Sequence, residues 1–586
     1  MDRTRAKAGG IEVRMDGGGE GFRGSLSTST LESGVELVHL RIASDEAGRP
    51  PVFRLSWSQP LVSVHGFWHS GAGYDKGLRV DWGKGVYSKA TSGAPVGCLY
   101  DLKGRNRLTF ALSDALEPVT FHAGVHEESG VASCWVRLFD EPLAPRAVYE
   151  ATLRLDTRDL PFYETLSDVS RWWAGLPGYE PAGVPETARL PMYSTWYSFH
   201  QDLDPGRIEE QCRLAKELGC EAVIVDDGWQ TTSNERGYAY TGDWEPAPEK
   251  VPDMRAHVDR VHALGMKFLL WYSVPFVGHR SRAWERFSGM LLEEIERLGA
   301  GVLDPRFPEV REFLIETYES ALREWDLDGF KLDFVDSFGT SQETGGGRDH
   351  DGVPEAVDSL LEDTIVRLRR IKPEVMVEFR QSYVGPLMRK YGNMFRAMDC
   401  PNDAVENRMH TLDIRLLGGD TATHSDMLMW HTEDPVHSAA LQLVNVLFSV
   451  PQISVLLDRI PPEHVEMLRF WLGFWREHRD VFLDGALEPL HPEANYPIVL
   501  ARTESKLAAA AYGNTVVPLE GAIPSTLLIV NGTLEEGVVL YLADDAGTRG
   551  IEVRDCMGRV TRTDSIALET GLHQIDIPPA GVAVLK

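Results

Sequence analysis

The stretch Gly329-Phe330-Lys331-Leu332-Asp333-Phe334 decides the fold class of this chain. It has the composition of a short buried β-strand, but it carries a lysine and an aspartate two residues apart. Successive side chains of a strand point to opposite faces, so Lys331 and Asp333 lie on the same face. In a barrel of parallel strands, functional side chains come from the carboxyl ends of the strands, which is where this stretch turns polar.

Seven further strand candidates of this kind flank the stretch, separated by amphipathic helices such as residues 205–219. Alternation of strands and helices over ~250 residues predicts a (β/α)8 barrel. The eight strand candidates cover residues 193–199, 222–227, 267–273, 329–334, 375–380, 394–399, 423–429 and 452–457.

The segments on either side have a different pattern. From residue 11 to about residue 160, and again beyond residue 484, short strand-like runs alternate with turn residues. We therefore expect a multidomain chain with an N-terminal antiparallel β-sandwich, a central (β/α)8 TIM barrel and a C-terminal β-sandwich. The expected domains are residues 1–175, 176–483 and 484–586.

Composition and charge restrict the class of protein. Of 586 residues, 43% are hydrophobic and 25% are charged, which suits globular domains and not a bundle of membrane helices. The net charge of −29 would repel nucleic acid and anionic lipid, so neither is an expected partner. The N-terminal residues lack the apolar run of an export signal, and six cysteines are scattered without metal-binding spacing. These features predict a cytoplasmic protein with reduced, buried thiols.

Polar residues close five of the expected strands. Any one acidic residue is as well explained as a cap of the following helix, but five such ends on one barrel are harder to explain in that way. The five ends are Asp226-Asp227, Asp333, Glu378-Phe379-Arg380, Arg396-Ala397-Met398-Asp399 and His424-Ser425-Asp426.

Asp333 is the candidate nucleophile. The ammonium group of Lys331 would keep its carboxylate ionised, as attack on an anomeric carbon requires. Glycoside hydrolysis with retention needs a second carboxyl group about 5–5.5 Å away, acting first as acid and then as base. We expect Asp399 in this role, because it closes strand six shortly after Arg396. Asp403 is the alternative, and it is also placed to cap the next helix.

Aspartates and tryptophans near other strand ends are candidate sugar-binding residues. Asp226 and Asp227 would be costly as two buried like charges unless polar groups such as sugar hydroxyls bind there. Trp196, Trp229 and Trp271 could offer apolar platforms to a pyranose ring, although each one alone is better explained by packing in the core or rim.

These motifs resemble the α-galactosidases of glycoside hydrolase family 36. The resemblance is clear from about residue 192 to residue 460 and vaguer in the flanking domains. It implies that Asp333 is the nucleophile, that Asp226 and Asp227 bind the O4 and O6 side of galactose, and that Lys331 binds ring hydroxyls. The matching stretches are Asp226-Asp227-Gly228-Trp229, Leu303-Asp304-Pro305 with Pro308-Glu309-Val310-Arg311, and Lys331-Leu332-Asp333.

Two departures from the family pattern affect the transfer of roles. Many members carry a Cys-Ser-Gly-Gly run after strand five, where this chain has Arg380 within the run from Glu378 to Tyr383. The arginine shortly before the acid/base is matched by Arg396, but the fourth residue after it, an acid in many relatives, is Cys400 here. We count Arg380 and Arg396 among the candidate sugar-binding residues.

The expected function is that of a retaining, exo-acting α-galactosidase without metal or cofactor, acting on oligosaccharides. An α-N-acetylgalactosaminidase or a galactosyltransferase of the raffinose-synthase type would use the same motifs. A non-catalytic glycan-binding protein would lack a nucleophile or acid, whereas candidates for both are present. A metal-dependent hydrolase could use a ligand set drawn from His424, Asp426, His431, Asp399 and Asp403, but no metal-binding spacing supports it. Assembly into a homo-oligomer stays open.

Overall fold

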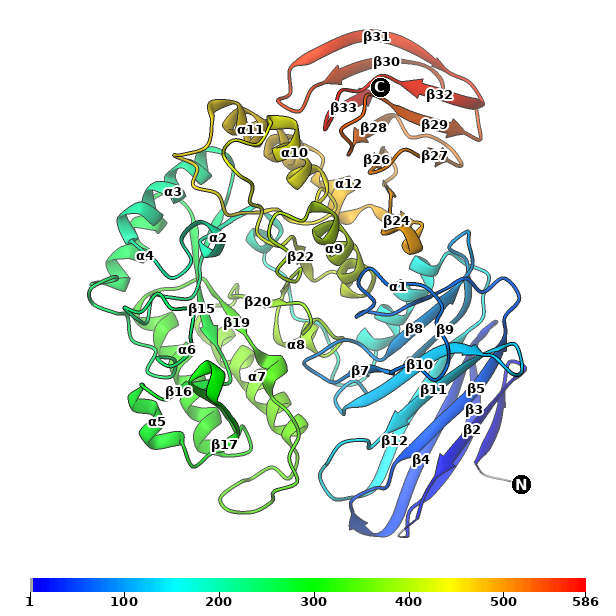
Figure 1. Ribbon diagram of the computed structural model, residues 1–586, viewed down its shortest axis with the longest axis vertical. Helices are drawn as coiled ribbons and strands as arrows, with labels where there is room; N and C mark the ends of the chain where they lie inside the picture. Colours follow the sequence, from blue (N-terminus) through cyan, green and yellow to red (C-terminus); the bar gives the residue numbers. More distant parts are fainter. Residues whose placement is uncertain (1–3, 20) are drawn as a thin grey trace.

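The computed structural model describes residues 4–19 and 21–586 (Figure 1). A β-sandwich formed by the N-terminal segment, blue to cyan, lies beside a barrel coloured teal to yellow, and an orange-to-red β-sandwich lies above the N-terminal one in this view. The expected fold class, a TIM barrel between two β-sandwiches, is confirmed.

Within the described residues, the central part is a closed barrel of eight parallel strands. The strands are β13 (Met192–Ser194), β14 (Ala222–Val225), β15 (Lys267–Ser273), β19 (Gly329–Asp333), β20 (Met376–Arg380), β21 (Met394–Arg396), β22 (Ala422–His424) and β23 (Gln452–Ile453). From β13 to β22 each strand pairs in parallel with the next, and β23 pairs in parallel with β13. Bridges from His424 to Val450 and from Leu428 to Ile453 close the ring. All eight expected strands are present, although β13, β21, β22 and β23 end three or more residues earlier than expected.

Helices cover the outside of the barrel. The helix expected over residues 205–219 is α3, which begins at Pro205 because the Asp204 side chain accepts a hydrogen bond from the Arg207 N–H. None of the helices in the described part of the chain combines the length and the apolar character that a bilayer crossing requires. The longer barrel helices are α3 (Pro205–Glu217), α4 (Met254–Ala263), α6 (Pro308–Glu324), α7 (Val353–Ile371), α9 (Ala404–Gly418), α10 (Val436–Val444) and α11 (Pro462–Glu477).

Two details of the barrel differ from expectation. The first strand ends at Ser194, and residues 196–199 form the short helix α2 (Trp196–Phe199), because the Ser454 hydroxyl accepts hydrogen bonds from the Tyr197 and Ser198 N–H groups. An unexpected small antiparallel sheet also lies between β15 and α6. Its strands are β16 (Phe276–Gly278), β17 (Leu291–Ile295) and β18 (Ala300–Leu303).

The N-terminal segment forms two packed antiparallel sheets around an apolar core that includes Trp57, Leu99 and Phe110. One sheet has the order β1 (Arg5–Ala8), β2 (Ile11–Gly17), β5 (Phe53–Pro60), β11 (Val131–Leu138), β10 (Val119–His126) and β7 (Val86–Ser88). The other has the order β3 (Arg23–Glu32), β4 (Val35–Gly48), β12 (Arg146–Asp156), β9 (Asn106–Leu112), β8 (Val96–Tyr100) and β6 (Gly66–Trp68).

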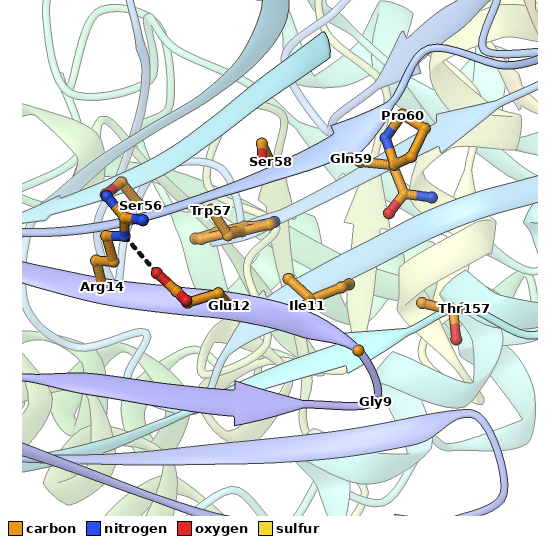
Figure 2. Close-up of a pocket in the computed structure, with 11 residues that line it drawn as sticks. Gly9, Ile11, Glu12, Arg14, Ser56, Trp57, Ser58, Gln59, Pro60 and Thr157 are labelled. Atoms are coloured by element: carbon orange, nitrogen blue, oxygen red, sulfur yellow. Dashed lines mark hydrogen bonds and ion pairs between the residues drawn. The ribbon is translucent and has the colours of Figure 1, made fainter. Parts of the chain in front are cut away.

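A hollow of about 800 Å³ lies in this N-terminal part (Figure 2). Gly9, Trp57, Pro60 and Thr157 are among the residues that line it, and an ion pair between Glu12 and Arg14 lies at one side. None of the polar residues that close the barrel strands lines the hollow, so it is separate from the candidate site.

The C-terminal segment forms a second sandwich from a larger and a smaller sheet, with a core that includes Leu507, Ile529 and Leu540. The larger sheet has the order β24 (Ala486–Leu490), β25 (Ile498–Arg502), β26 (Lys506–Ala511), β28 (Thr526–Asn531), β33 (Val582–Leu585), β30 (Gly547–Arg554) and β31 (Val560–Leu568). The smaller sheet contains β27 (Val516–Leu519), β29 (Val538–Leu542) and β32 (Gly571–Ile575).

A buried polar cluster joins the three parts of the chain. Asp413 on barrel helix α9 accepts hydrogen bonds from the indole of Trp68 (3.0 Å) and the hydroxyl of Tyr496 (2.5 Å). Its other oxygen lies 3.2 Å from the ammonium nitrogen of Lys76, and neither side chain is more than 2% exposed. Trp68 and Lys76 come from the N-terminal segment, and Tyr496 comes from the C-terminal one, so one carboxylate contacts both flanking parts.

We predict that Asp413→Ala destabilises the whole chain, because it leaves the Lys76 ammonium buried without a counter-charge. Breaking a buried pair in this way costs about 3–5 kcal/mol. Thermal unfolding should begin at a clearly lower temperature than in the wild type, and Lys76→Met added to Asp413→Ala should recover part of the loss. The control is Asp259→Ala, which breaks an exposed ion pair with Arg255 and should cost less than about 1 kcal/mol. Equal effects of Asp413→Ala and Asp259→Ala would contradict the prediction.

Candidate active site

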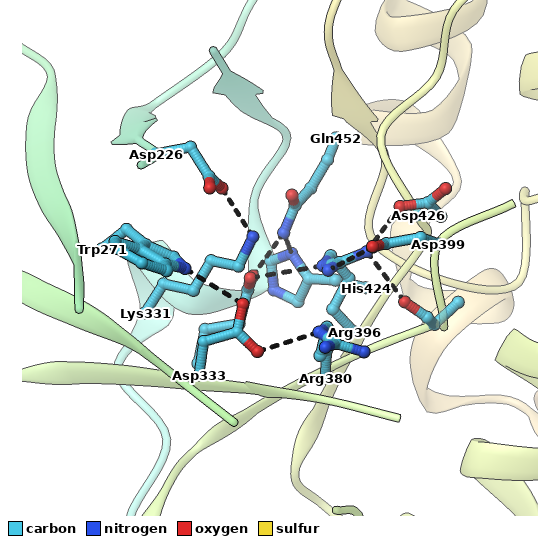
Figure 3. A network of polar contacts seen from close by, with 12 residues as sticks. Asp226, Trp271, Lys331, Asp333, Arg380, Arg396, Asp399, His424, Asp426 and Gln452 are labelled. Atoms are coloured by element: carbon cyan, nitrogen blue, oxygen red, sulfur yellow. Dashed lines mark hydrogen bonds and ion pairs between the residues drawn. The ribbon is translucent and has the colours of Figure 1, made fainter. Parts of the chain in front are cut away.

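The polar strand ends converge at the carboxyl side of the barrel (Figure 3). Figure 3 shows Asp333 between Trp271 and Arg380, with Lys331 reaching Asp226 on one side and Arg396 reaching Asp399 and Asp426 on the other. The structure thus brings together side chains from β14, β15, β19, β20, β21 and the segment after β22, which are distant in sequence but adjacent in the ring of strands.

Asp333 is buried and accepts hydrogen bonds on both carboxylate oxygens. Oδ1 accepts from the guanidinium of Arg380 (2.9 Å), the main-chain N–H of Phe334 (2.9 Å) and the hydroxyl of Tyr383. Oδ2 accepts from the indole of Trp271 (3.0 Å). Burial alone would raise the pKa of Asp333, but Arg380, Lys331 and these donors hold it well below its usual range. The carboxylate is therefore ionised and fixed in orientation.

The backbone after Asp333 takes a rarely populated conformation. Phe334 has φ = 64° although it is not a glycine, and this turn points its N–H back at the Asp333 carboxylate. Strained residues of this kind persist where the surrounding structure holds them and are concentrated at functional sites.

The N-terminal sandwich contacts the two loops that follow β19 and β20. The Lys89 ammonium donates to the main-chain carbonyls of Asp336 (2.8 Å) and Phe338 (2.6 Å), just beyond Asp333. The Gly93 N–H donates to the Ser382 carbonyl (2.8 Å), directly before Tyr383. The flanking part therefore holds both loops that carry hydrogen-bond donors to Asp333.

Asp226 and Asp227 lie side by side after β14 but have different partners. Asp226 pairs with the Lys331 ammonium at 2.5 Å, and both side chains are buried. Asp227 accepts from the amide groups of Gln201 (2.6 Å) and Gln230 (2.7 Å). Main-chain N–H groups bind the carbonyl oxygen of each glutamine, so each amide must turn its NH2 group toward Asp227. Burial nevertheless raises the pKa of Asp227 to about 6.

Arg396 is the centre of a second group of carboxylates. Its guanidinium donates to Asp399 (2.9 Å) and Asp426 (2.5 Å), and its Nε lies 3.6 Å from Glu378. The Asp399 side chain is 45% exposed, whereas Asp426 and Glu378 are fully buried. Burial and the charge of Asp333 act to raise the pKa of Asp399, but the arginine and its neighbouring cations keep it below the usual value.

The alternative residue Asp403 lies outside this group. It is the N-cap of α9, where its side chain accepts from the Glu406 N–H at 2.9 Å. The Tyr74 hydroxyl also donates to it at 3.3 Å. Cys400, at the position where many relatives carry an acid, is buried and its N–H donates to Asp426 (2.7 Å).

The three candidate tryptophans have different environments. Trp271 is 1% exposed and donates to Asp333, so it orients that carboxylate. Trp229 has no exposed surface: it donates to the Trp271 carbonyl, and its ring packs on Trp244 and Tyr272. This burial corrects the expectation that Trp229 offers its face to a sugar. Trp196 is partly exposed and lies against His200.

Several residues of the site were missed by sequence reasoning. Tyr383, Gln201 and Gln230 bind the candidate carboxylates but stand in loops, where no periodic pattern identifies them. Glu378 was already among the expected polar strand ends, and it lies two residues before Arg380 and therefore on the same face of its strand. Over residues 4–19 and 21–586, no group of three or more His, Cys, Asp or Glu side chains is arranged to hold a metal ion.

His424 is fully buried beneath the site, where its Nε2 lies 2.7 Å from the Ala188 carbonyl. Burial, with the nearby charge of Arg396, lowers its pKa to about 4. The folded chain therefore binds this proton only near pH 4, whereas the unfolded chain binds it near the ordinary histidine pKa of about 6.5. Its contribution to stability is present above about pH 6.5 and is lost as the pH falls toward 4.

We predict that His424→Gln weakens this acid destabilisation. In the wild type, the histidine alone should remove up to about 3 kcal/mol between pH 6.5 and 4, from a pKa difference of roughly 2.5 units. Unfolding midpoints measured across this pH range should fall less steeply in the variant. His431→Gln, at an exposed histidine, is the control and should keep the wild-type slope. A His424→Gln slope equal to that of the control would contradict the assignment of a neutral His424.

Comparisons with known proteins find sequence similarity in part of the barrel. Residues 186–353 match the Melibiase family model. The chain is 28% identical over 160 residues to a protein of Emericella nidulans named probable alpha-galactosidase G, and the match covers 24% of this chain and 22% of that protein. The aligned segment thus spans about a fifth of the relative's length.

Solved structures are similar over nearly the whole chain. An α-galactosidase from Lactobacillus brevis superposes with a TM-score of 0.67 at 15% identity, covering 98% of this chain and 81% of that one. A variant of the family 36 α-galactosidase AgaA from Geobacillus stearothermophilus, solved in complex with raffinose, gives a TM-score of 0.63 at 14% identity, covering 98% and 83%. The expected resemblance is confirmed: residues 186–353 are similar to the Melibiase family, and the chain has the fold of the glycoside hydrolase family 36 α-galactosidases.

Proposed function

We propose that this protein is a retaining, exo-acting α-galactosidase that removes terminal α-galactosyl residues from oligosaccharides. The observation that carries the proposal is the ionised, fourfold hydrogen-bonded carboxylate of Asp333 at a barrel strand end, with Asp399 near enough for the charge of one to affect the pKa of the other. The likeness to α-galactosidases in barrel sequence and in fold supports it.

In the first step, a carboxylate oxygen of Asp333 attacks the anomeric carbon. The bond to the leaving group breaks, the protonated carboxyl of Asp399 gives its proton to the departing oxygen, and a glycosyl ester of Asp333 forms. In the second step, Asp399 takes a proton from water while the water oxygen attacks the same carbon. This releases galactose with its original configuration and restores both carboxyl groups.

Electrostatics support the exchange of roles at Asp399. The negative charge of Asp333 raises the pKa of Asp399, and ester formation removes that charge. The pKa of Asp399 therefore falls once the ester exists. After Asp399 has given its proton to the leaving group it stays ionised, and this ionised form can serve as the base for water. In the free site, Arg396 and its neighbours keep Asp399 ionised. A bound sugar that displaces water from this partly exposed carboxyl would raise its pKa toward the protonated state.

Galactose recognition is assigned to the side of the site opposite Arg396. Asp226, Asp227 and Lys331 form a buried set of acceptors and one donor, suited to the hydroxyls of one epimer. A sugar epimer whose hydroxyl leaves these charged groups unpaired loses more binding free energy than a sugar that only packs less closely. Arg380 and Arg396 are proposed to border the C2 side and the leaving group.

The surroundings of the protein are also proposed. All six cysteines are buried free thiols, as expected, and such thiols are typical of a reducing compartment. We therefore propose the cytoplasm as the location of the protein. Its proposed binding partner, an oligosaccharide, follows from the proposed activity.

The test of the proposed function is a panel of aryl α-glycosides. We predict that the wild type hydrolyses the α-galactoside, releases α-galactose as the first anomer seen by NMR, and turns over the α-glucoside poorly. Asp333→Ala should fold normally but lose turnover on the order of 10⁴-fold or more, since no ester can form. Release of β-galactose first would contradict retention, and near-normal turnover by Asp333→Ala would contradict its role.

A second prediction separates Asp399 from Asp403. Asp399→Ala should damage turnover of oligosaccharides far more than that of activated aryl galactosides, because a good leaving group needs little protonation. Azide needs no general base, so it should restore activity and give an α-galactosyl azide. Asp403→Ala is the matched variant, and it should show the smaller effect of a lost helix cap, about 0.5–2 kcal/mol of stability. Azide rescue in Asp403→Ala with none in Asp399→Ala would transfer the role to Asp403.

A further inference from the structure

A row of buried hydrogen bonds lies beneath the candidate carboxylates. Gln452 Nε2 on β23 lies 3.2 Å from Nδ1 of His424 on β22 and 2.5 Å from Oε2 of Glu378 on β20. His424 Nε2 lies 2.7 Å from the Ala188 carbonyl. The three side chains have no exposed surface, so they cannot contact a ligand and their polar atoms depend on one another. Figure 3 shows Gln452 and His424 in the same network of polar contacts.

The direction of these bonds is determined from one end. A carbonyl can only accept, so Nε2 of His424 carries the hydrogen that Ala188 binds. The ring is neutral, which leaves Nδ1 as an acceptor, and only the NH2 group of Gln452 can donate to it. The second hydrogen of that NH2 group then points to Glu378. Oε2 of Glu378 therefore accepts a hydrogen bond from Gln452, and this bond fixes one oxygen of the carboxyl group.

The other oxygen of Glu378 faces Arg396. Oε1 lies 3.6 Å from Nε of the guanidinium. In the described part of the chain, neither of these two atoms has a hydrogen-bond partner, although both are buried. The remaining nitrogens of Arg396 bind Asp399, Asp426 and the Ala397 carbonyl. Glu378 thus stands at the one edge of the guanidinium that no other group occupies.

We infer that Glu378, held by Gln452 and His424, is a positioning residue that fixes Arg396 and, through it, the carboxyl group of Asp399. The inference rests on the proposed function, because it gives Asp399 a role in proton transfer. Glu378 acts in two ways. It prevents the guanidinium from turning away from Asp399. Burial raises the pKa of Glu378, but Arg396, Lys331 and the bond from Gln452 favour its ionised form, and in that form its charge offsets part of the positive charge that Arg396 directs at Asp399.

The charge effect has a definite sign. Arg396, Lys331 and Arg380 stabilise the ionised form of Asp399, whereas Asp333 and Asp426 oppose it. The Tyr197 hydroxyl donates a hydrogen bond to Asp426 and so belongs to the same group of residues. If Glu378 becomes neutral, it no longer offsets the positive charge of Arg396, which then stabilises the ionised form of Asp399 more strongly. The pKa of Asp399 falls, so Asp399 loses its proton at a lower pH. As a general acid, it would then fail earlier as the pH rises.

The experiment compares Glu378→Gln with the wild type on two substrates, methyl α-galactoside and 4-nitrophenyl α-galactoside. The poor leaving group of the first needs protonation, and that of the second needs little. We expect kcat/KM to fall by about 10-fold or more for the first and by less than about 3-fold for the second. The basic limb of the pH profile for methyl α-galactoside should move to lower pH. Glu378→Asp, which keeps the charge, should restore part of both effects.

The matched control is Glu117→Gln. Glu117 is also a buried glutamate paired with an arginine, Arg146, but it lies in the N-terminal sandwich. This variant should keep the wild-type ratio between the two substrates and the wild-type pH profile. If Glu378→Gln behaves like Glu117→Gln, or loses activity equally on both substrates with an unmoved basic limb, Glu378 is merely structural and the inference fails.

A crystal structure of Glu378→Gln separates this failure from failure of the proposed function. If the wild type hydrolyses no α-galactoside, the proposed function is wrong, and the positioning of Arg396 is judged from the coordinates alone. We expect the Arg396 guanidinium to move and its 2.9 Å bond to Asp399 to lengthen or break. An unchanged Arg396–Asp399 pair in a folded Glu378→Gln protein would overturn the inference.

Discussion

The structure at the open end of the barrel depends on the compensation of buried carboxylates by a few cations. Asp333, Asp226 and Asp426 would each be costly to ionise away from water, and each is paired with one side chain among Arg380, Lys331 and Arg396. The cations are spread around the ring of strands, so each carboxylate has a defined partner. This placement of the cations matters for catalysis by two carboxyl groups, because one of them must be ionised while the other holds a proton.

The flanking sandwiches take part in the same arrangement. Lys89 and Gly93 hold the loops after β19 and β20, and those loops carry Phe334 and Tyr383, two of the donors to Asp333. The cluster around Asp413 ties both sandwiches to α9, the helix that follows Asp399. The barrel is thus braced on the side where its polar residues lie, which is consistent with a site that needs fixed geometry.

Sequence reasoning succeeded where a regular period carries the information. The eight strands could be predicted, because each is a short apolar run between amphipathic helices, and Asp333 and Lys331 could be placed on one face by the two-residue period of a strand. It was less successful where the chain leaves that period. The end of the first strand was placed too late, since the hydroxyl of Ser454, more than two hundred residues away, draws residues 196–199 into a helix. The small sheet that contains β17 was missed, since its strand has charged residues on a partly exposed surface.

The sequence by itself determined the barrel, the two β-rich flanks and the strand ends at which carboxylates and cations would gather. These follow from local composition and spacing, which act between neighbours along the chain. Only the tertiary structure decided which of these groups meet. It placed Asp403 at a helix cap and Asp399 on Arg396, turned Trp229 into the core, and brought Glu378, His424 and Gln452 together beneath the site. For Asp399 and Asp403, whose partners Arg396 and Glu406 are three residues away, the structure selected between alternatives that the sequence left open. The contacts of Trp229, Glu378, His424 and Gln452 join segments distant in sequence through ring closure and burial, so no local pattern contains them.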